Sequence, residues 1–110
     1  MATGTYWQRG ESIDYVNGTG SKISANTIIL AGSLLGVAGT DIESGESGSM
    51  IIAGIFELPK VTGTALTLGQ QVQWDNSNGY IKAYSTGDVH GIVVADAASA
   101  ADKVYVKINA

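Results

Sequence analysis

Residues 48–60 read Gly-Ser-Met-Ile-Ile-Ala-Gly-Ile-Phe-Glu-Leu-Pro-Lys, which is the longest apolar run of the chain and ends beside its only proline. The β-branched isoleucines and Phe56 favour a strand. Both alternating faces of the run are largely apolar, so the pattern predicts one central strand covered on both sides, with Glu57 near its solvated end. A buried helix is the alternative, and the internal Gly54 and the flanking Pro59 disfavour it. Because Pro59 has no amide proton, strand pairing should stop there.

Composition indicates a single β-rich domain. The chain has 110 residues, about the length of one domain. Charged residues make up only 15%, against a typical quarter, and glycine is abundant at 15 residues. These values fit short strands joined by tight turns rather than a helical bundle, which needs leucine, glutamate and lysine at helical spacing. The absence of cysteine excludes disulfides and thiolate metal sites.

The charge and hydropathy patterns argue against nucleic acid and membranes as partners. The net charge is −4 and the sequence pI is about 4.6, the opposite of a nucleic-acid footprint. No apolar run reaches the roughly 18 residues of a membrane span. Residues 1–5 lack the basic start and apolar core of a signal peptide, so we expect a soluble protein made in the cytoplasm.

The remaining strands are predicted from short alternating runs. Asn78-Gly79 lies between two such runs and is a strong hairpin signal, and Leu34 to Ala38 forms a second hairpin with the strand before it. The alanine-rich residues 96–102 suggest one helical turn, and Gly36-Val37-Ala38 is echoed by Gly91 to Ala95. The expected strands are residues 12–16, 27–30, 34–38, 50–58, 70–74, 80–84, 89–95 and 103–108. In the last of them, alternation predicts that Val104, Val106 and Ile108 point inward and that Lys103, Tyr105 and Lys107 point outward.

This spacing predicts an all-β fold, a small single-domain sandwich or barrel of about eight short strands with an extended N-terminal arm. We expect an arm and edge strand over residues 1–20 and a β domain over residues 21–110. Asn17-Gly18-Thr19, which also reads as a glycosylation sequon, is interpreted as a turn.

A search for catalytic and cofactor motifs finds none that is complete. Gly18-Thr19-Gly20-Ser21-Lys22 resembles a phosphate loop, but Lys22 does not follow a glycine, Ile23 replaces the metal-binding hydroxyl residue, and no helix is predicted after it. The only histidine, His90, has no recognisable nucleophile motif around it, which favours a structural role. We therefore expect no enzyme, no cofactor and no metal site.

Two weaker binding signals remain. Asp41, Glu43 and Glu46 share one loop where clustered oxygens could attract calcium, but the loop lacks the EF-hand pattern and a solvated acidic loop is favoured. Trp74 and Tyr80 flank the predicted hairpin tip. They could form a sugar-binding platform, although aromatic pairs across a hairpin more often stabilise the sheet.

Several segments together resemble one known family. They are Arg9 to Tyr15 (G-[DE]-x-I-[DE]-Y), Gly36 to Gly48 (GVA-x-x-DI-x-x-GE-x-G), Gly54 to Lys60 (G-x-FELPK), Val72 to Asp75 with Asn78-Gly79 (V-x-WD…NG), and Gly91 to Ala95. In their order and spacing they are similar to the capsid cement, or head decoration, proteins of tailed bacteriophages. Members of that family have sometimes been labelled recombinase-like, which the failed phosphate loop does not support.

The resemblance implies a structural protein that binds the outer surface of the assembled head and stabilises it against the pressure of the internal DNA. It implies the major capsid protein as partner, a homotrimer, and a place on the virion exterior after synthesis in the host cytoplasm. It implies no catalytic residues. The alternative that we keep is a small carbohydrate- or ligand-binding β module of a phage fibre or tail, using Trp74 and Tyr80.

Contact residues are expected near the N-terminus. Residues 1 to about 11 are poor in apolar side chains for docking on their own core, yet they contain Tyr6, Trp7, Gln8 and Arg9. Tyrosine, tryptophan and arginine are enriched at binding hot spots. We expect this arm to become ordered on the partner shell; the alternative is an edge strand that packs against its own subunit or a neighbouring one.

Overall fold

The computed structural model describes residues 2–5 and 10–109, and it confirms the all-β prediction. No helix occurs among these residues. The described part of the chain therefore contains no helix that is long and apolar enough to cross a membrane. The described part forms nine strands: β1 (Ser12–Val16), β2 (Ile28–Ala31), β3 (Leu34–Ala38), β4 (Ser47–Ile51), β5 (Ile55–Pro59), β6 (Gln71–Asp75), β7 (Tyr80–Ala83), β8 (Gly91–Val93) and β9 (Lys103–Ile108).

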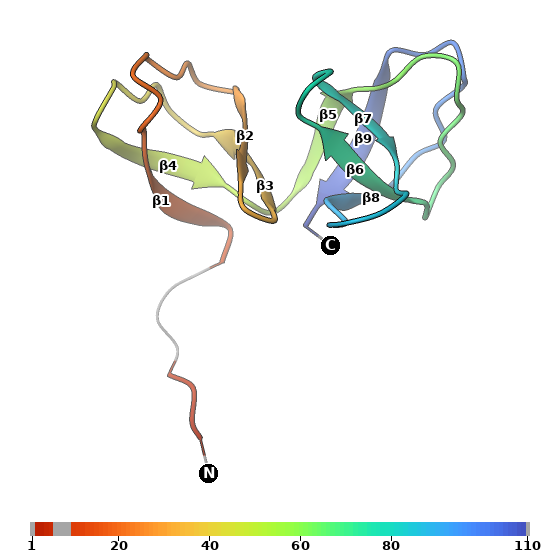
Figure 1. Ribbon diagram of the computed structural model, residues 1–110. Helices are drawn as coiled ribbons and strands as arrows, with labels where there is room; N and C mark the ends of the chain where they lie inside the picture. Colours follow the sequence, from red (N-terminus) through yellow and green to blue (C-terminus); the bar gives the residue numbers. More distant parts are fainter. Residues whose placement is uncertain (1, 6–9, 110) are drawn as a thin grey trace.

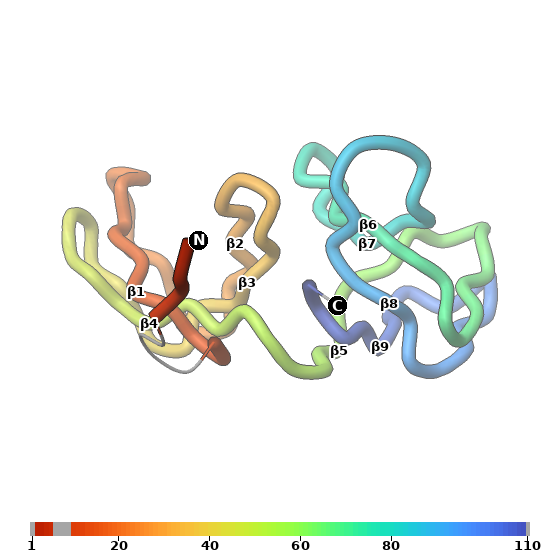
Figure 2. Tube along the Cα trace, turned by 90° about the horizontal axis from the view of Figure 1, so that it is seen from below, coloured from red at the N-terminus to blue at the C-terminus, as the bar shows by residue number. Residues whose placement is uncertain are grey.

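The strands form two antiparallel sheets, which lie side by side (Figures 1 and 2). The first has the order β1-β4-β3-β2 and the second β5-β9-β8-β6-β7. We call residues 11–53 the first unit and residues 54–109 the second unit. Strand β1 is an edge strand with the predicted bounds, and residues 2–5 are exposed and extend away from both sheets (Figure 1).

The apolar run that suggested one central strand is in fact two strands in different sheets, so that prediction is wrong. Strand β4 ends at Ile51 and β5 begins at Ile55. Between them the backbone of Gly54 has φ of 122°, in a region that favours glycine, and this lets the chain turn from the first sheet into the second. Strand β5 ends at Pro59, as the missing amide predicts.

Both predicted hairpins are confirmed. Strands β2 and β3 pair from Ile28 opposite Val37 to Ala31 opposite Leu34, and β6 and β7 pair around a turn in which Gly79 has φ of 75°. The helical turn expected over residues 96–102 is wrong. Ala97 there exchanges two backbone hydrogen bonds with Leu66, which holds the segment in an extended bridge.

Each unit has its own apolar core. The core of the first unit is small, and its buried members are Ile23, Ile29, Ala38, Ile42 and Met50. The core of the second is larger and is built from alternate residues of its strands; β9, for example, buries Val104, Val106 and Ile108 and exposes the residues between them, as predicted. Leu35 of the first unit is fully buried in this second core, which joins the units.

The two units repeat one topology. Strands β1, β2, β3 and β4 correspond to β5, β6, β8 and β9, because the pairs β1–β4, β4–β3 and β3–β2 recur as β5–β9, β9–β8 and β8–β6. The register recurs too: Ile29 lies opposite Gly36, and Val72 lies opposite Gly91. The short sequence echo noted above therefore marks equivalent positions.

Equivalent hydrogen bonds support the same correspondence. Ile23 bridges to Ile42 in the first unit, and Leu66 bridges to Ala97 in the second. Beside the first bridge, Oδ1 of Asp41 accepts a hydrogen bond from the amide of Ala25 at 2.7 Å. Beside the second, Oδ1 of Asp96 accepts one from the amide of Leu68, also at 2.7 Å. The same fold is thus built twice from largely different residues.

A buried polar side chain follows the first strand of each unit. Asn17 has no exposed area and donates hydrogen bonds to the carbonyls of Ser21 and Ile42. At the equivalent position, Lys60 is only 3% exposed. Its ammonium group donates to three carbonyls, those of Val61 (2.7 Å), Ser99 (3.4 Å) and Ala101 (3.2 Å). Both side chains satisfy loop carbonyls that would otherwise lose water without replacement. The burial of Asn17 also fits the interpretation of its sequon as a turn.

The units differ in how their sheets end. The second unit has an additional strand, β7, which follows β6 in the sequence and lies beyond it in the sheet, next to the counterpart of β2. Ile81 of β7 forms a parallel bridge with Lys60, so the sheet closes from β7 back to β5. Among the described residues the first unit has no strand in this position, and β1 and β2 remain its two edges.

We predict that Lys60→Met lowers the free energy of unfolding by about 3 kcal/mol, because the apolar stem is kept while three partly buried carbonyls lose their charged donor. Chemical denaturation followed by tryptophan fluorescence measures the change. The control is Lys82→Met, which removes a more exposed lysine paired with Asp75 at 3.8 Å and should cost less than about 1 kcal/mol. Equal losses in the two variants would contradict this role for Lys60.

Candidate binding surfaces

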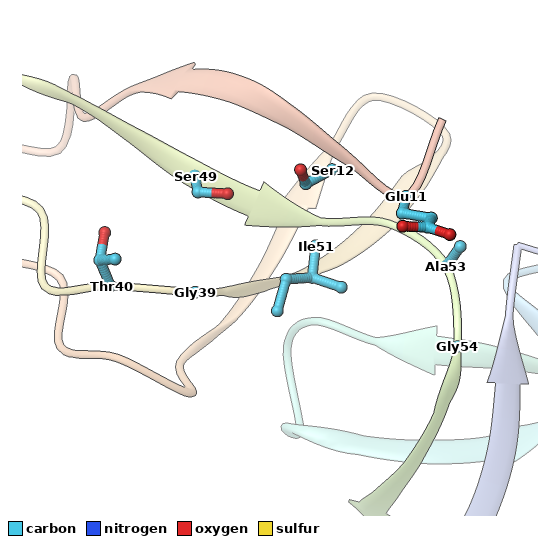
Figure 3. A pocket seen from close by; sticks show the side chains of 8 residues that line it. All are labelled: Glu11, Ser12, Gly39, Thr40, Ser49, Ile51, Ala53 and Gly54. Atoms are coloured by element: carbon cyan, nitrogen blue, oxygen red, sulfur yellow. The ribbon is translucent and has the colours of Figure 1, made fainter. Parts of the chain in front are cut away.

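An open groove lies on the first unit beside the connection between β4 and β5 (Figure 3). It has a volume of about 620 Å³. Ile51 and Ala53 provide its apolar surface and Glu11 its one ionisable side chain. We call it the β4 groove; its lining residues are Glu11, Ser12, Gly39, Thr40, Ser49, Ile51, Ala53 and Gly54. Acid–base catalysis commonly uses a pair of ionisable groups, and this groove has one. Its shape and lining are better suited to receiving a side chain of a binding partner.

A second, smaller groove separates the two units. Ile28 and Val37 form one wall and residues of β5 the other. We call it the inter-unit groove; it is lined by Asn26, Ile28, Val37, Phe56, Glu57, Leu58 and Pro59. Val37 lies opposite Ile51 in the β3–β4 pair, so the two grooves adjoin on one face of the first sheet.

The outer face of β5 and β9 exposes large apolar side chains. Ile55 is 59% and Tyr105 51% exposed. The Tyr105 hydroxyl is hydrogen-bonded to the Glu57 carboxylate on the paired strand, and this bond, with the negative charge of Glu57, raises the pKa of Tyr105. We call Ile55, Glu57, Lys103, Tyr105 and Lys107 the β5–β9 face. A tyrosine and an isoleucine within a charged rim are typical of protein contact surfaces.

His90 has a structural role, as expected. It is 5% exposed, and its Nδ1 accepts a hydrogen bond from the amide of Trp74 at 2.8 Å. An accepting Nδ1 requires the neutral ring with its proton on Nε2. Burial lowers the pKa of His90, and the Asp88 carboxylate opposes this only in part. A neutral, buried ring bonded to backbone is unsuited to activating a nucleophile.

The acidic loop is held by a lysine and by the backbone. Lys22 lies 3.4 Å from Asp41 and 3.8 Å from Glu43, and all three side chains are about half exposed. The amide of Ala25 and the ammonium group of Lys22 lower the pKa of Asp41. No group of three or more potential metal ligands occurs in residues 2–5 and 10–109. Lys22 therefore belongs to a structural ion pair.

Trp74 and Tyr80 do not form a platform. Trp74 lies opposite Ile81, and Tyr80 lies opposite Asp75. Because successive strand residues point to opposite faces, the two aromatic rings lie on different sides of the hairpin. Trp74 packs against the second core instead, and its Nε1 donates to Asn76 at 3.2 Å.

The predicted contact residues Tyr6, Trp7, Gln8 and Arg9 lie outside the described residues. Sequence reasoning did not identify the two grooves or the β5–β9 face. The exposed Tyr105 was placed on the outer side of its strand by alternation, which was the one available signal.

The fold and these surfaces define a small all-β protein with several candidate binding surfaces. A profile of the phage cement protein family matches residues 7–108, almost the whole chain. The chain belongs to the phage cement protein family, which confirms the resemblance seen in its sequence. No curated protein and no solved structure matches the chain.

We predict that His90 makes the protein less stable in mild acid. Its folded pKa is lowered, so the unfolded chain binds the proton first, and stability falls as the pH drops below the ordinary value of about 6.5. Melting temperatures between pH 7.5 and 5 measure the effect. His90→Gln keeps a hydrogen-bond acceptor without titrating, so its melting temperature should change less over this range. An identical slope in both proteins would contradict the prediction.

Proposed function

We propose that this chain binds the outer surface of an assembled tailed-phage head and reinforces it against the pressure of the packaged DNA. The observation that carries the proposal is the family match over residues 7–108. The partners are the major capsid protein and further copies of the chain, arranged as a homotrimer on the virion exterior after synthesis in the host cytoplasm. Under this proposal the chain has no catalytic role.

The physical basis is linkage between binding and shell stability. A protein that binds the intact shell but not its separated subunits stabilises the shell by RT ln(1 + [L]/Kd) at each site. Many copies on one shell multiply this free energy. The chain has ten acidic against six basic residues, so its net charge favours no attraction to the packaged DNA, and we propose that its contacts are made with protein.

We propose that the β5–β9 face contacts the shell. Ile55 and Tyr105 offer apolar area for burial, and the charged residues around them can form a polar rim. Tyr6, Trp7, Gln8 and Arg9 provide a second contact, with the capsid or with a neighbouring subunit. The alternative of a sugar-binding module loses its support because Trp74 and Tyr80 lie on opposite sides of their hairpin.

We predict that heads lacking this protein bind the purified chain and then retain their DNA to higher temperature. Bound copies are counted by mass measurement, and DNA release is followed with an intercalating dye during heating. Ile55→Asp should weaken binding at least tenfold, since a charge in a buried contact is left without a partner.

The matched control is Leu68→Asp, which changes another apolar residue that is 67% exposed but lies outside the β5–β9 face. It should leave binding unchanged. Heads that bind no wild-type chain, or that release DNA at the same temperature with and without it, would disprove the proposed function. Equal binding by both variants would disprove only the proposed contact face.

A further inference from the structure

The first sheet is open where the second is closed. In the second unit, β7 lies between β6 and the end of β5: it pairs with β6 along Val72 to Asp75 and meets Lys60 through Ile81. The equivalent strands of the first unit are β2 and β1, and both are edges of their sheet. We call the space between β2 and Asn17, the residue equivalent to Lys60, the open slot.

Apolar residues of the first unit are more exposed than their equivalents in the second unit, as expected if the first unit lacks a covering strand. Ile81 of β7 has no exposed area and covers the second core. Leu58 and Ile108 in that unit are 3% and 2% exposed. Their counterparts in the first unit, Tyr15 and Ile52, are only partly buried although they pack against the first core. Tyr15 and Ile52 therefore lack a covering segment of the kind that β7 provides in the second unit.

The second unit also shows which kind of segment fits. A strand in the position of β7 runs antiparallel to β2 and parallel to β1, since β7 is antiparallel to β6 and its bridge to Lys60 is parallel. Its central residue lies opposite Ala31, the equivalent of Trp74. Alanine leaves the space that an indole ring fills in the second unit, so the open slot has room for a large aromatic side chain from the incoming strand.

The N-terminal segment matches these requirements in sequence. Tyr6-Trp7-Gln8-Arg9 aligns with Tyr80-Ile81-Lys82-Ala83 of β7, with Trp7 at the position of Ile81. The charges are complementary. Arg9 is the one charged side chain of residues 1–10, whereas the first unit carries five carboxylates against a single lysine: Glu11, Asp14, Asp41, Glu43 and Glu46 against Lys22.

A chain cannot place this segment in its own slot. Trp7 would have to lie level with Asn17, about 20 Å along β1 from Glu11 at a rise of about 3.3 Å per residue. The four residues from Trp7 to Glu11 span about 14 Å at most. Moreover, two parallel neighbouring strands of one chain need a connection of a dozen or more residues. The segment must therefore come from another molecule.

We propose that residues 6–9 of a second copy of this chain occupy the open slot as an added strand, with Trp7 opposite Ala31. This rests on, and specifies, the subunit contact proposed above for these residues. The donor segment and the slot are different surfaces of one molecule, so the contact is of the head-to-tail kind that closes into a ring when the rotation between copies allows it. Its backbone hydrogen bonds and the buried indole would hold neighbouring copies together.

The absence of native cysteine allows a direct test. One preparation of the full chain carries Trp7→Cys and another Ala31→Cys, and the mixture is oxidised mildly at about 0.1 mM protein. Residues opposite one another in antiparallel strands lie about 4.5–5.5 Å apart between Cα atoms, within the range of a disulfide. We expect a covalent dimer containing one chain of each kind. It should form at least tenfold faster than in a control mixture of Gln8→Cys with Ala31→Cys, because residue 8 faces away from Ala31.

A second measurement keeps the tryptophan. Sedimentation of the wild-type chain at the same concentration should show self-association. Ala31→Trp fills the slot and should weaken this association at least tenfold, whereas Ala65→Trp, which changes an exposed alanine of the second unit outside the slot, should not; thermal unfolding checks that both variants are folded. A monomeric wild-type chain, or cross-linking no faster than in the control, would overturn the inference. Head binding by the wild-type chain is scored separately, so failure of the proposed function remains distinguishable.

Discussion

The side-chain amide of Asn109 fixes the two units of this protein relative to each other. Its Oδ1 accepts a hydrogen bond from the amide of Leu35 at 3.0 Å, and its Nδ2 donates to the carbonyls of Leu35 (2.6 Å) and Ile52 (2.7 Å). Asn109 thus joins the end of the second unit to β3 and to the connection before β5. The backbone amide and carbonyl of Leu35 are thus both hydrogen-bonded to Asn109, and its side chain inserts into the second core. Both grooves and the course of β5 depend on this junction.

A second consequence of the architecture is an asymmetry between two similar units. Both have the same strand order and the same bridge between loops, and both bury a polar side chain after their first strand. Only the second contains β7, which closes its sheet and covers a large core. The first keeps two strand edges and several half-buried apolar residues. Exposed strand edges readily pair with other chains, so natural proteins usually protect them. Under the proposed function, in which copies assemble on a phage head, such an edge can instead join copies.

Much of the fold could be predicted because its signals are local. Alternation in residues 103–108 and the Asn78-Gly79 turn each specify a strand or hairpin without reference to the rest of the chain. The break between β4 and β5 could not be predicted in this way. An apolar run with an internal glycine fits one buried strand as well as two strands separated by a turn, and only the positive φ of Gly54 distinguishes them.

The duplication was hidden for a different reason. Its equivalent positions preserve geometry more than residue type, as Asn17 and Lys60 illustrate, and the sequences share only short features such as Gly36 with Gly91. Among the site residues, the alternation around Tyr105 was readable. The grooves were not, because they are formed by segments far apart in the sequence.

The most direct test of this account is a cryo-electron microscopy reconstruction of heads decorated with this protein, at a resolution that separates strands. The account predicts that the β5–β9 face lies on the shell. It also predicts an added strand beside β2, parallel to β1 and continuous with the N-terminus of β1 in the adjacent copy. Copies that stand apart on the shell, with β2 facing solvent, would contradict it.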